Sequence, residues 1–473
     1  MKLSSSKPDM AAGSIGKLLL RLSIPAITAQ LVNVLYNIVD RIYIGHIPVV
    51  GTDALTGVGV TFPILTLISA FSFFVGSGGA PQAAINMGKG NKDEAERILG
   101  NCFTMLVSIS IVLTALILAL QRPMLMAFGA SESTIDYAVD YLTLYTCGTI
   151  FIQLVLGLNP FISCQGFASV AMKTTLIGAL LNIVLDPVFI FLFGLGVKGA
   201  AVATVISQAI SCVWVLKFLT GNKSQLKIRK QYLIPNKKIV FSVLALGISP
   251  FIMQSTESIL FVSFNSSLQT YGQDIAVGSM TILSSLMQFA LLPVLGLCQG
   301  GQPIISYNYG ARNNDRVKKA FYLILISCFT YTTILTAAIF LNSKMFVSLF
   351  TDNKELIEFA SWAVKIYMAG TFFFGIQIAC QQTFIALNEA KLSLFLAIFR
   401  KIILLIPLIY MLPALLPESV GMMFIPEGFA ALVTHPAKVF SVFFAEPVSD
   451  IIAVAATATL FALNFNKILM RER

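Results

Sequence analysis

Residues 78–93, GGAPQAAINMGKGNKD, occur again in altered form as residues 300–315, GGQPIISYNYGARNND. Seven of the 16 aligned positions are identical, where roughly one identity would be expected by chance, and such self-similarity indicates an internal repeat. Gly88 meets Gly310, and Asn86 meets Asn308. Both copies follow a long apolar run and lead into a basic stretch and a further apolar run. The chain is therefore built from two related halves.

The apolar runs around the two copies are long enough to cross a membrane. The chain has 473 residues, of which 57% are hydrophobic and 11% are charged, whereas soluble domains carry about 25% charged residues. The mean hydropathy is +0.84. A transmembrane helix needs about 20 predominantly apolar residues. Twelve spans are predicted, at 18–46, 54–87, 98–121, 134–164, 167–193, 197–221, 240–270, 274–309, 317–342, 355–388, 391–417 and 440–468.

The expected fold is an all-α polytopic membrane protein with twelve transmembrane helices in two pseudo-symmetric six-helix bundles. Residues 1–221 form the predicted N-terminal lobe and residues 239–473 the C-terminal lobe. Residues 222–238 are a basic linker between them. Because six is an even number, the two halves have the same orientation in the membrane and are related by an axis along its normal.

The formal net charge of +10 is distributed in a way that argues against nucleic-acid binding. With the N-terminus inside, 25 of the 32 Lys and Arg residues fall in or next to inward loops, Arg400 and Lys401 included. This is the positive-inside bias of membrane proteins, and it places both termini in the cytoplasm. The first 17 residues form a short, polar and basic segment without the pattern of a cleavable signal peptide.

Cysteine and histidine give no sign of a metal centre. The seven cysteines fall in apolar spans without a C-x-x-C spacing, and we expect them to be reduced core residues. The two histidines, His46 and His435, fall in predicted outer loops. We therefore expect neither a histidine metal site nor a histidine base.

Residues 179–191, ALLNIVLDPVFIF, place two polar side chains in an apolar span. Asn182 and Asp186 are four residues apart and so share one face of a helix. A carboxylate inside a membrane is costly and indicates a functional site. This face is the first candidate for half of a coupling-ion site. Aligning Pro187 with Pro407 in the second half sets Asp186 against Ile406, which restricts the predicted ion chemistry to the first half.

A second polar stripe runs along the first predicted helix. Asn33, Tyr36 or Asn37, and Asp40 follow the i, i+3/i+4, i+7 spacing of one helix face. In a membrane such a stripe points into a bundle or a water-filled cavity. The alternative is that Asp40 marks the outer end of the helix and pairs with Arg41.

Further polar residues lie in other spans. The sixth span contains Thr204 and Gln208, and the seventh contains Glu257, which is either a site residue or an acid hydrogen-bonded to neighbouring helices. We interpret Lys365 and Arg400 as structural or interfacial charges that extend towards the membrane surface.

Several segments together resemble the multidrug and toxic compound extrusion (MATE) family. They are LxxSIPAITAQLVNVLYNIVDRIYIG (20–45), PQAAINMGKGNKDEA (81–95), NIVLDPVFIF (182–191), GGQPIISYNYGARN (300–313) and FFAEPVSDIIAVAAT (443–457). The resemblance covers nearly the whole chain and implies two helix bundles around a V-shaped central cleft. It matches relatives of bacterial and archaeal type with an acidic pair in the N-terminal half.

The resemblance also implies particular site residues. It assigns cation coupling, with Na⁺ as a possible ion, to Asp40, Asn182, Asp186 and Thr204. It matches polar cavity residues of that half to Asn33, Tyr36 and Asn159, and some multidrug members carry Glu where this chain has Asn159. To the same lining set we add Asn37, Gln208 and Glu257.

The predicted function is secondary active antiport, with export of amphipathic, often cationic organic compounds in exchange for Na⁺ or H⁺. Such a protein contributes to drug resistance, is no enzyme and needs no cofactor. We expect a multi-pass protein of the cell membrane, a monomer, whose partners are small organic substrates and membrane lipids and not nucleic acid.

Three other functions are alternatives. A lipid or lipid-linked oligosaccharide flippase of related architecture would need a cationic central groove, and Asp40 and Asp186 argue against one. A passive channel would need a filter-like repeat or a charged ring, and the sequence shows neither. An intramembrane enzyme would need a nucleophile with its base, or metal ligands, and no such motif occurs.

Overall fold

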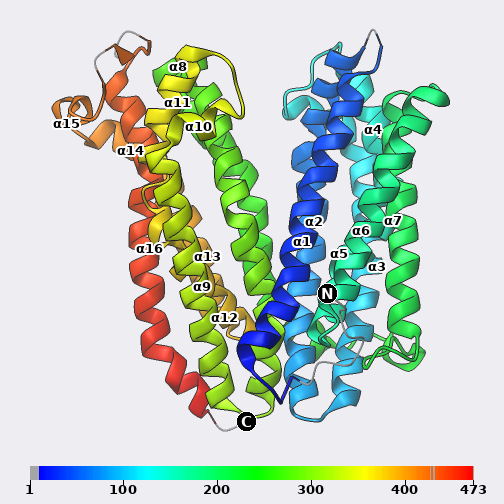
Figure 1. Ribbon diagram of the computed structural model, residues 1–473. Coiled ribbons are helices and arrows are strands. Elements are labelled where there is room, and N and C mark those ends of the chain that lie inside the picture. Colours follow the sequence, from blue (N-terminus) through cyan, green and yellow to red (C-terminus); the bar gives the residue numbers. More distant parts are fainter. Residues whose placement is uncertain (1–9, 49, 427, 430–431, 472–473) are drawn as a thin grey trace. The chain divides into compact units, whose positions relative to one another are not determined.

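The computed structural model describes residues 10–48, 50–426, 428–429 and 432–471, and it contains helices and connecting loops but no strand in these ranges (Figure 1). The first half consists of α1 (Ile15–Gly45), α2 (Gly51–Gly88), α3 (Lys92–Ala127), α4 (Ile135–Cys147), α5 (Thr149–Cys164), α6 (Ala168–Pro187), the π-helix η1 (Val188–Leu192), α7 (Val197–Thr220) and the short 3₁₀-helix η2 (Lys230–Tyr232).

The second half begins with one very long helix. It consists of α8 (Lys237–Gly310), α9 (Asn314–Leu341), α10 (Ser343–Ser348), α11 (Lys354–Tyr367), α12 (Thr371–Ala386), α13 (Ala390–Ile398), the π-helix η3 (Phe399–Leu405), α14 (Ile406–Leu415), α15 (Glu418–Met422) and α16 (Pro436–Met470). Helix α8 is two helices in succession, because the backbone of Gln273 has φ 55° and ψ −155°.

These helices correspond to the twelve predicted spans. Among the described residues, nine helices are long and apolar enough to cross a membrane. Two bent pairs meet the same test together, α4 with α5 at 58° and α11 with α12 at 49°. Counting each bent pair as one span and α8 as two gives twelve. Large apolar side chains such as Ile111 and Val112 are 61% and 63% exposed on the helix sides, as expected of surfaces that face lipid. The prediction of an all-α, multi-pass membrane protein is confirmed.

The chain forms two compact units. The first contains residues 1–254, 299–320 and 385–390, and the second contains residues 255–298, 321–384 and 391–473. In the first unit α1 packs along α6, α6 along α7, and α2 along α3 and α5 (Figure 1). In the second unit α16 packs against α11, α14 and η3. Residues 237–254 and 299–310 of α8 therefore belong to the first unit, and residues 255–298 of the same helix belong to the second.

The repeated glycines bring two helices of the first unit into backbone contact. A Cβ atom added at Gly88 of α2 would lie 2.0 Å from the carbonyl oxygen of Tyr307, and one at Gly310 of α8 would lie 2.0 Å from that of Ile85. Only glycine allows backbones to approach so closely. The two copies of the repeat therefore pack on each other with the same residue used in the same way.

The basic linker 222–238 is fixed to the first unit by buried polar groups. The Gln165 side-chain oxygen accepts hydrogen bonds from the backbone nitrogens of Gln225 at 2.7 Å and Leu226 at 3.0 Å. Arg229 forms an ion pair at 2.5 Å with Glu96, whose side chain is fully buried. The linker is thus an ordered connection and not a free tether.

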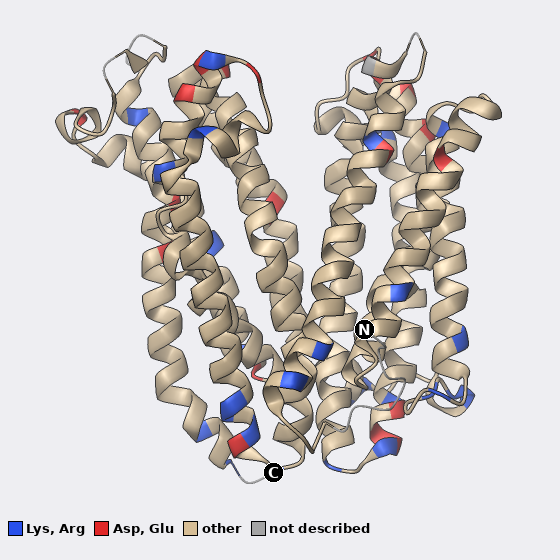
Figure 2. Cartoon of the chain, in the orientation of Figure 1, with Lys and Arg blue, Asp and Glu red and all other residues tan. Residues whose placement is uncertain are grey.

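Most charged residues gather at the helix ends, and the middle parts of the helices carry few (Figure 2). Arg400 and Lys401 are not inward-loop charges, and of the two interpretations given for Arg400, a structural or an interfacial charge, the structure agrees with the structural one. Both lie in η3 and are buried, with 8% and 5% of their surface exposed. They do not extend to a membrane surface, because carboxylates lie beside them and bind them within the bundle.

Candidate ion and substrate site

Three helices of the first unit bring the predicted ion-site residues together. Asn182 and Asp186 lie on one face of α6, and the Asn182 amide nitrogen donates to Asp186 Oδ1 at 2.9 Å. The same nitrogen donates to Thr204 Oγ1 of α7 at 3.3 Å. Asp40 of α1 completes the group, and its carboxyl lies close enough to that of Asp186 for the two to interact electrostatically. The i, i+4 spacing on α6 therefore has the geometry expected from the sequence.

The site is buried, and several of its side-chain oxygen atoms accept no hydrogen bond from the described residues. Asp186 is 0% exposed, Asn182 2%, and Asp40 9%. Asp40 Oδ1, Asp186 Oδ2 and Asn182 Oδ1 are buried and have no hydrogen-bond partner among the described residues. Unpaired buried carboxylate oxygens cost free energy. A proton or a small hard cation would satisfy them, because such cations prefer oxygen ligands.

Asp40 is a buried residue of α1 and not an exposed helix end. No ion pair joins it to Arg41, although the structure describes both residues. The Arg41 guanidinium instead lies over the Phe62 ring at 5.3 Å. Arg41 still acts on the Asp40 carboxyl electrostatically, and the role of Asp40 as a site residue stays a prediction.

Two tyrosines that were not predicted as site residues, Tyr141 and Tyr145, lie near Tyr36, which was predicted. Tyr36 of α1 faces Asp40 and Asp186. Tyr141 and Tyr145 of α4 stack on each other at 5.9 Å and also face Asp40. Their i, i+4 spacing was visible in the sequence, but tyrosine pairs at this spacing are ordinary packing residues in many helices. Only the position of α4 next to α2 and α7 brings them to the site.

The remaining polar residues of α1 and α7 lie close to this group. The Asn37 side chain donates to the Asn33 carbonyl oxygen at 2.6 Å. Gln208 lies beside Gly178 of α6, one turn from Asn182, and its side-chain oxygen is buried without a partner in the described part of the chain. Thr204 and Gln208 are one turn apart on α7 and so share the face that packs on α6, where Thr204 presents its hydroxyl oxygen to Asn182 and Gln208 its amide nitrogen to Gly178.

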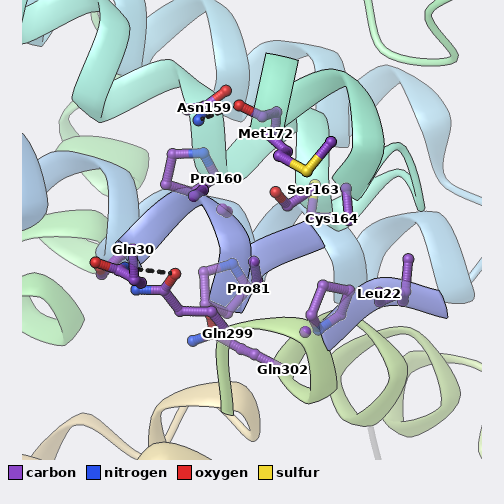
Figure 3. Close-up of a pocket in the computed structure, with 18 of the residues that line it drawn as sticks. Leu22, Gln30, Pro81, Asn159, Pro160, Ser163, Cys164, Met172, Gln299 and Gln302 are labelled. Carbon is purple, nitrogen blue, oxygen red and sulfur yellow. Dashed lines mark hydrogen bonds between the residues drawn. The ribbon is translucent and has the colours of Figure 1, made fainter. Parts of the chain in front are cut away.

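A cavity of about 160 Å³ lies in the same unit (Figure 3). Gln30 of α1 donates to Gln299 of α8 at 3.1 Å across its wall (Figure 3). The predicted cavity residues Asn33 and Asn159 line it. The other lining side chains are apolar, small or neutral, and include Leu22, Phe73, Pro81, Leu156, Pro160, Ser163, Met172 and Gln302. None of the described residues that line the cavity carries a charge.

Asn159 has hydrogen-bonding capacity left for a ligand. Its amide nitrogen donates to the Ala171 carbonyl oxygen at 3.1 Å, and its side-chain oxygen is buried with no described group bonded to it. Tyr36, Asn37 and Gln208 do not line this cavity. They stay predictions for a more extended binding region.

Glu257 lies in the second unit, in a separate group of charges. Its carboxylate forms an ion pair with Lys401 of η3. Next to it, Arg400 is bound by Glu446 and Asp450 of α16. Glu446 and Asp450 are not among the site residues predicted from the sequence. Two acids four residues apart on each side of Pro447, inside an apolar span, were the available signal.

The described residues contain no group of three or more His, Cys, Asp or Glu side chains arranged to hold a metal ion. The cysteines among them are free thiols, and one pair, Cys298 and Cys328, has its sulfur atoms 3.8 Å apart.

Fold and site together define a multi-pass helical membrane protein with buried carboxylates inside its bundles, an arrangement typical of ion and solute pathways. The family model MatE matches residues 25–188 and 250–411. The chain therefore belongs to the MatE family of transporters, and the two matched regions fall in its two halves.

Relatives and solved structures agree with this family. The chain is 26% identical over 420 residues to the multidrug export protein MepA of Staphylococcus aureus (strain NCTC 8325 / PS 47), covering 88% of this chain and 92% of the relative. It is 26% identical over 404 residues to MepA of Staphylococcus haemolyticus (strain JCSC1435), covering 85% and 88%. The fold is similar to the outward-facing conformation of a multidrug resistance MATE family transporter, with TM-score 0.85 and 22% identity over 98% of each chain.

A transporter from Pyrococcus furiosus Vc1 has the same fold, with TM-score 0.84 and 22% identity over 98% of each chain. The binding pocket of that transporter has reversed polarity, which suggests that its function is different. A shared fold at this identity therefore leaves the function to the site residues.

Proposed function

We propose that this protein is a secondary active antiporter that exports amphipathic, often cationic organic compounds in exchange for Na⁺ or H⁺. The supporting observation is that two buried carboxyl groups, those of Asp40 and Asp186, lie within electrostatic range of each other, with Asn182 and Thr204 hydrogen-bonded beside Asp186. The name of the Staphylococcus aureus relative, a multidrug export protein, supports the same class of substrate.

The coupling step follows from the charges of this site. Two ionised carboxylates in a water-poor site repel each other, and binding of one cation or proton removes the repulsion. Because Asp40 is on α1 and Asp186 on α6, the bound ion holds these two helices together. Loss of the ion removes this attraction and favours separation of α1 from α6. Na⁺ would use the oxygens of both acids with those of Asn182 and Thr204, whereas a proton needs only the two carboxylates.

Helix α1 is the physical connection between ion and substrate. Asn33 lines the cavity and lies seven residues before Asp40 on the same helix, which is about 10 Å along its axis. Pro25 removes a backbone hydrogen bond from α1 and makes it easier to bend. Exchange requires that ion and substrate bind preferentially to different conformations. A change in the bend of α1 would therefore alter both the ion site and the substrate cavity.

The cavity favours substrates with a large apolar surface. Its uncharged lining of apolar groups and amides offers van der Waals contact and adaptable hydrogen bonds. The absence of Lys and Arg among its described lining residues argues against a headgroup-binding flippase groove. We further propose that the protein acts as a monomer in the cell membrane, surrounded by lipid, with both termini in the cytoplasm.

The test is efflux of a panel of amphipathic cationic dyes from vesicles with imposed Na⁺ or pH gradients. Asp40→Asn and Asp186→Asn should each lower gradient-driven efflux at least about tenfold, because loss of a charged hydrogen-bonding partner costs about 1.5–3 kcal/mol. Asp136→Asn is the matched control, since Asp136 is exposed on α4 and pairs with exposed Arg122. The gradient that drives the wild type identifies the ion. Wild-type efflux in both site variants would refute the proposal.

A further inference from the structure

The second unit contains a buried group of charges that the proposed antiport does not use. Arg400 of η3 donates through Nε to Asp450 Oδ1 at 2.8 Å and through Nη2 to Glu446 Oε1 at 2.8 Å. Glu446 and Asp450 are four residues apart on α16, so both face η3. The side chains of Arg400, Glu446 and Asp450 are only 10%, 6% and 0% exposed. We call these three residues the α16 triad.

The α16 triad has one positive charge and two carboxyl groups. Arginine stays protonated in proteins, so full ionisation of both acids leaves one negative charge in excess. The neighbouring cation, Lys401, already pairs with Glu257 of α8, whose side chain is 61% exposed. Tyr367 of α11 also faces the triad, and Phe374 of α12 covers the Arg400 guanidinium at 4.3 Å. Neither residue supplies a positive charge.

An excess charge in this position is expensive. A buried carboxylate without its own cation costs several kcal/mol. Two carboxyl groups that share one site avoid this cost by keeping one proton between them. The charge count of the α16 triad is balanced when one proton is bound and unbalanced when it is lost.

One oxygen of the α16 triad is placed to carry that proton. Asp450 Oδ1 accepts both contacts from Arg400, at 2.8 and 2.7 Å. Asp450 Oδ2 is buried and has no hydrogen-bond partner in the ranges that the structure describes. A Cβ atom added at Gly370 would lie 2.9 Å from it. Gly370 lies in the break between α11 and α12, where the chain bends by 49°, so the unpaired oxygen lies against this bend.

We propose that Glu446 and Asp450 together bind one exchangeable proton beside Arg400. This makes the α16 triad a protonation site separate from Asp40 and Asp186. Loss of the proton leaves an uncompensated negative charge against the bend between α11 and α12. Protonation is thereby linked to the conformation of that bend. Loss of the proton favours a conformation in which water or a cation reaches the charged carboxylate. The inference goes beyond the proposed antiport and does not depend on it.

The proton is tested by infrared difference spectra of the purified full-length protein across a pH titration. The background is Asp40→Asn with Asp186→Asn, which removes the first carboxylate site and any dependence on transport. We expect a protonated-carboxyl band that titrates in this background. Glu446→Gln and Asp450→Asn should each abolish its titration, because the remaining carboxylate then pairs one-to-one with Arg400. Asp352→Asn, an exposed acid of the same unit, should leave it unchanged. A missing band, or one unchanged by both substitutions, would overturn the proposal.

Thermal melting of variants in the otherwise wild-type chain gives an independent test. Glu446→Gln and Asp450→Asn each imitate the protonated triad and should melt close to the wild type. The double variant leaves Arg400 buried without a carboxylate and should melt far lower. If each single variant melts as low as the double, both acids are ionised in the native protein and the proposal is wrong. Failure of gradient-driven efflux in the wild type would leave both results unaffected, so the two proposals fail separately.

Discussion

At the scale of single residues, the ion site depends on how one amide is used. The Asn182 nitrogen donates to both Asp186 and Thr204, and its oxygen has no partner among the described residues. Asn182 therefore joins α6 to α7, and its oxygen is the atom that the proposed antiport assigns to a cation. The hydroxyl of Thr204 supplies a further oxygen at the edge of the same group.

The role of Thr204 is open to a sharp substitution test. Thr204→Val keeps the shape and removes the oxygen, and we expect the half-saturating concentration of the coupling ion to rise about fivefold, because a neutral hydrogen-bonding group contributes about 1 kcal/mol. The measurement is the ion dependence of initial efflux rates in vesicles. Thr204→Ser retains the hydroxyl and serves as control. An unchanged ion dependence in Thr204→Val would exclude Thr204 from the site.

At the scale of helices, the breaks are as informative as the regular parts. Helix α8 changes direction at Gln273, and the pairs α4–α5 and α11–α12 bend at short interruptions. The π-helices η1 and η3 follow α6 and α13 at corresponding places in the two halves. Such wide turns often occur at functional sites, and here one lies just after Asp186 and the other contains Arg400.

The close contact between α2 and α8 predicts that replacing Gly88 destabilises the protein. Gly88→Ala puts a Cβ atom onto the Tyr307 carbonyl oxygen, and we expect the free energy of unfolding to fall by about 1–3 kcal/mol, as overpacking does elsewhere. Melting temperatures of the purified protein measure it.

The matched control for this crossing is Gly59→Ala in the same helix. A Cβ atom at Gly59 meets nothing within 4 Å in the described part of the chain, so alanine should be neutral or slightly stabilising there. Equal melting temperatures for the two variants would show that the α2–α8 contact does not need glycine.

At the scale of the whole molecule, the two halves share backbone features and differ in charge. The repeat places Gly88 and Gly310 in equivalent contacts. The equivalence of Asp186 with Ile406 predicted ion chemistry in the first half alone. The second unit nevertheless contains buried charges on η3 and α16, among them the α16 triad. Arg400 and Lys401 lie six and five residues before Ile406, and Glu446 and Asp450 come from another helix, so a residue-by-residue comparison of the halves did not find them.

The positive-inside bias predicts the orientation of the molecule. In a variant without exposed Cys147, Lys230→Cys in the linker should react with a membrane-impermeant maleimide only after the cells are opened. Lys344→Cys in α10 should react on intact cells. Both positions are exposed, so access depends on the side of the membrane. The reverse labelling pattern would show that the termini lie outside.

The sequence by itself determined the helices, their approximate ends and the duplication, because membrane spans are set by local hydropathy and length. It also determined the Asn182–Asp186 face, since residues four apart on a helix are always neighbours. Tertiary structure alone decided which helices supply the partners. Asp40 meets Asp186 across 146 positions of the sequence, Tyr141 and Tyr145 arrive from α4, and Arg400 binds acids about fifty residues away. These contacts depend on helix packing, which no local periodicity encodes, and they decide which buried charged groups have partners among the described residues and which have none there.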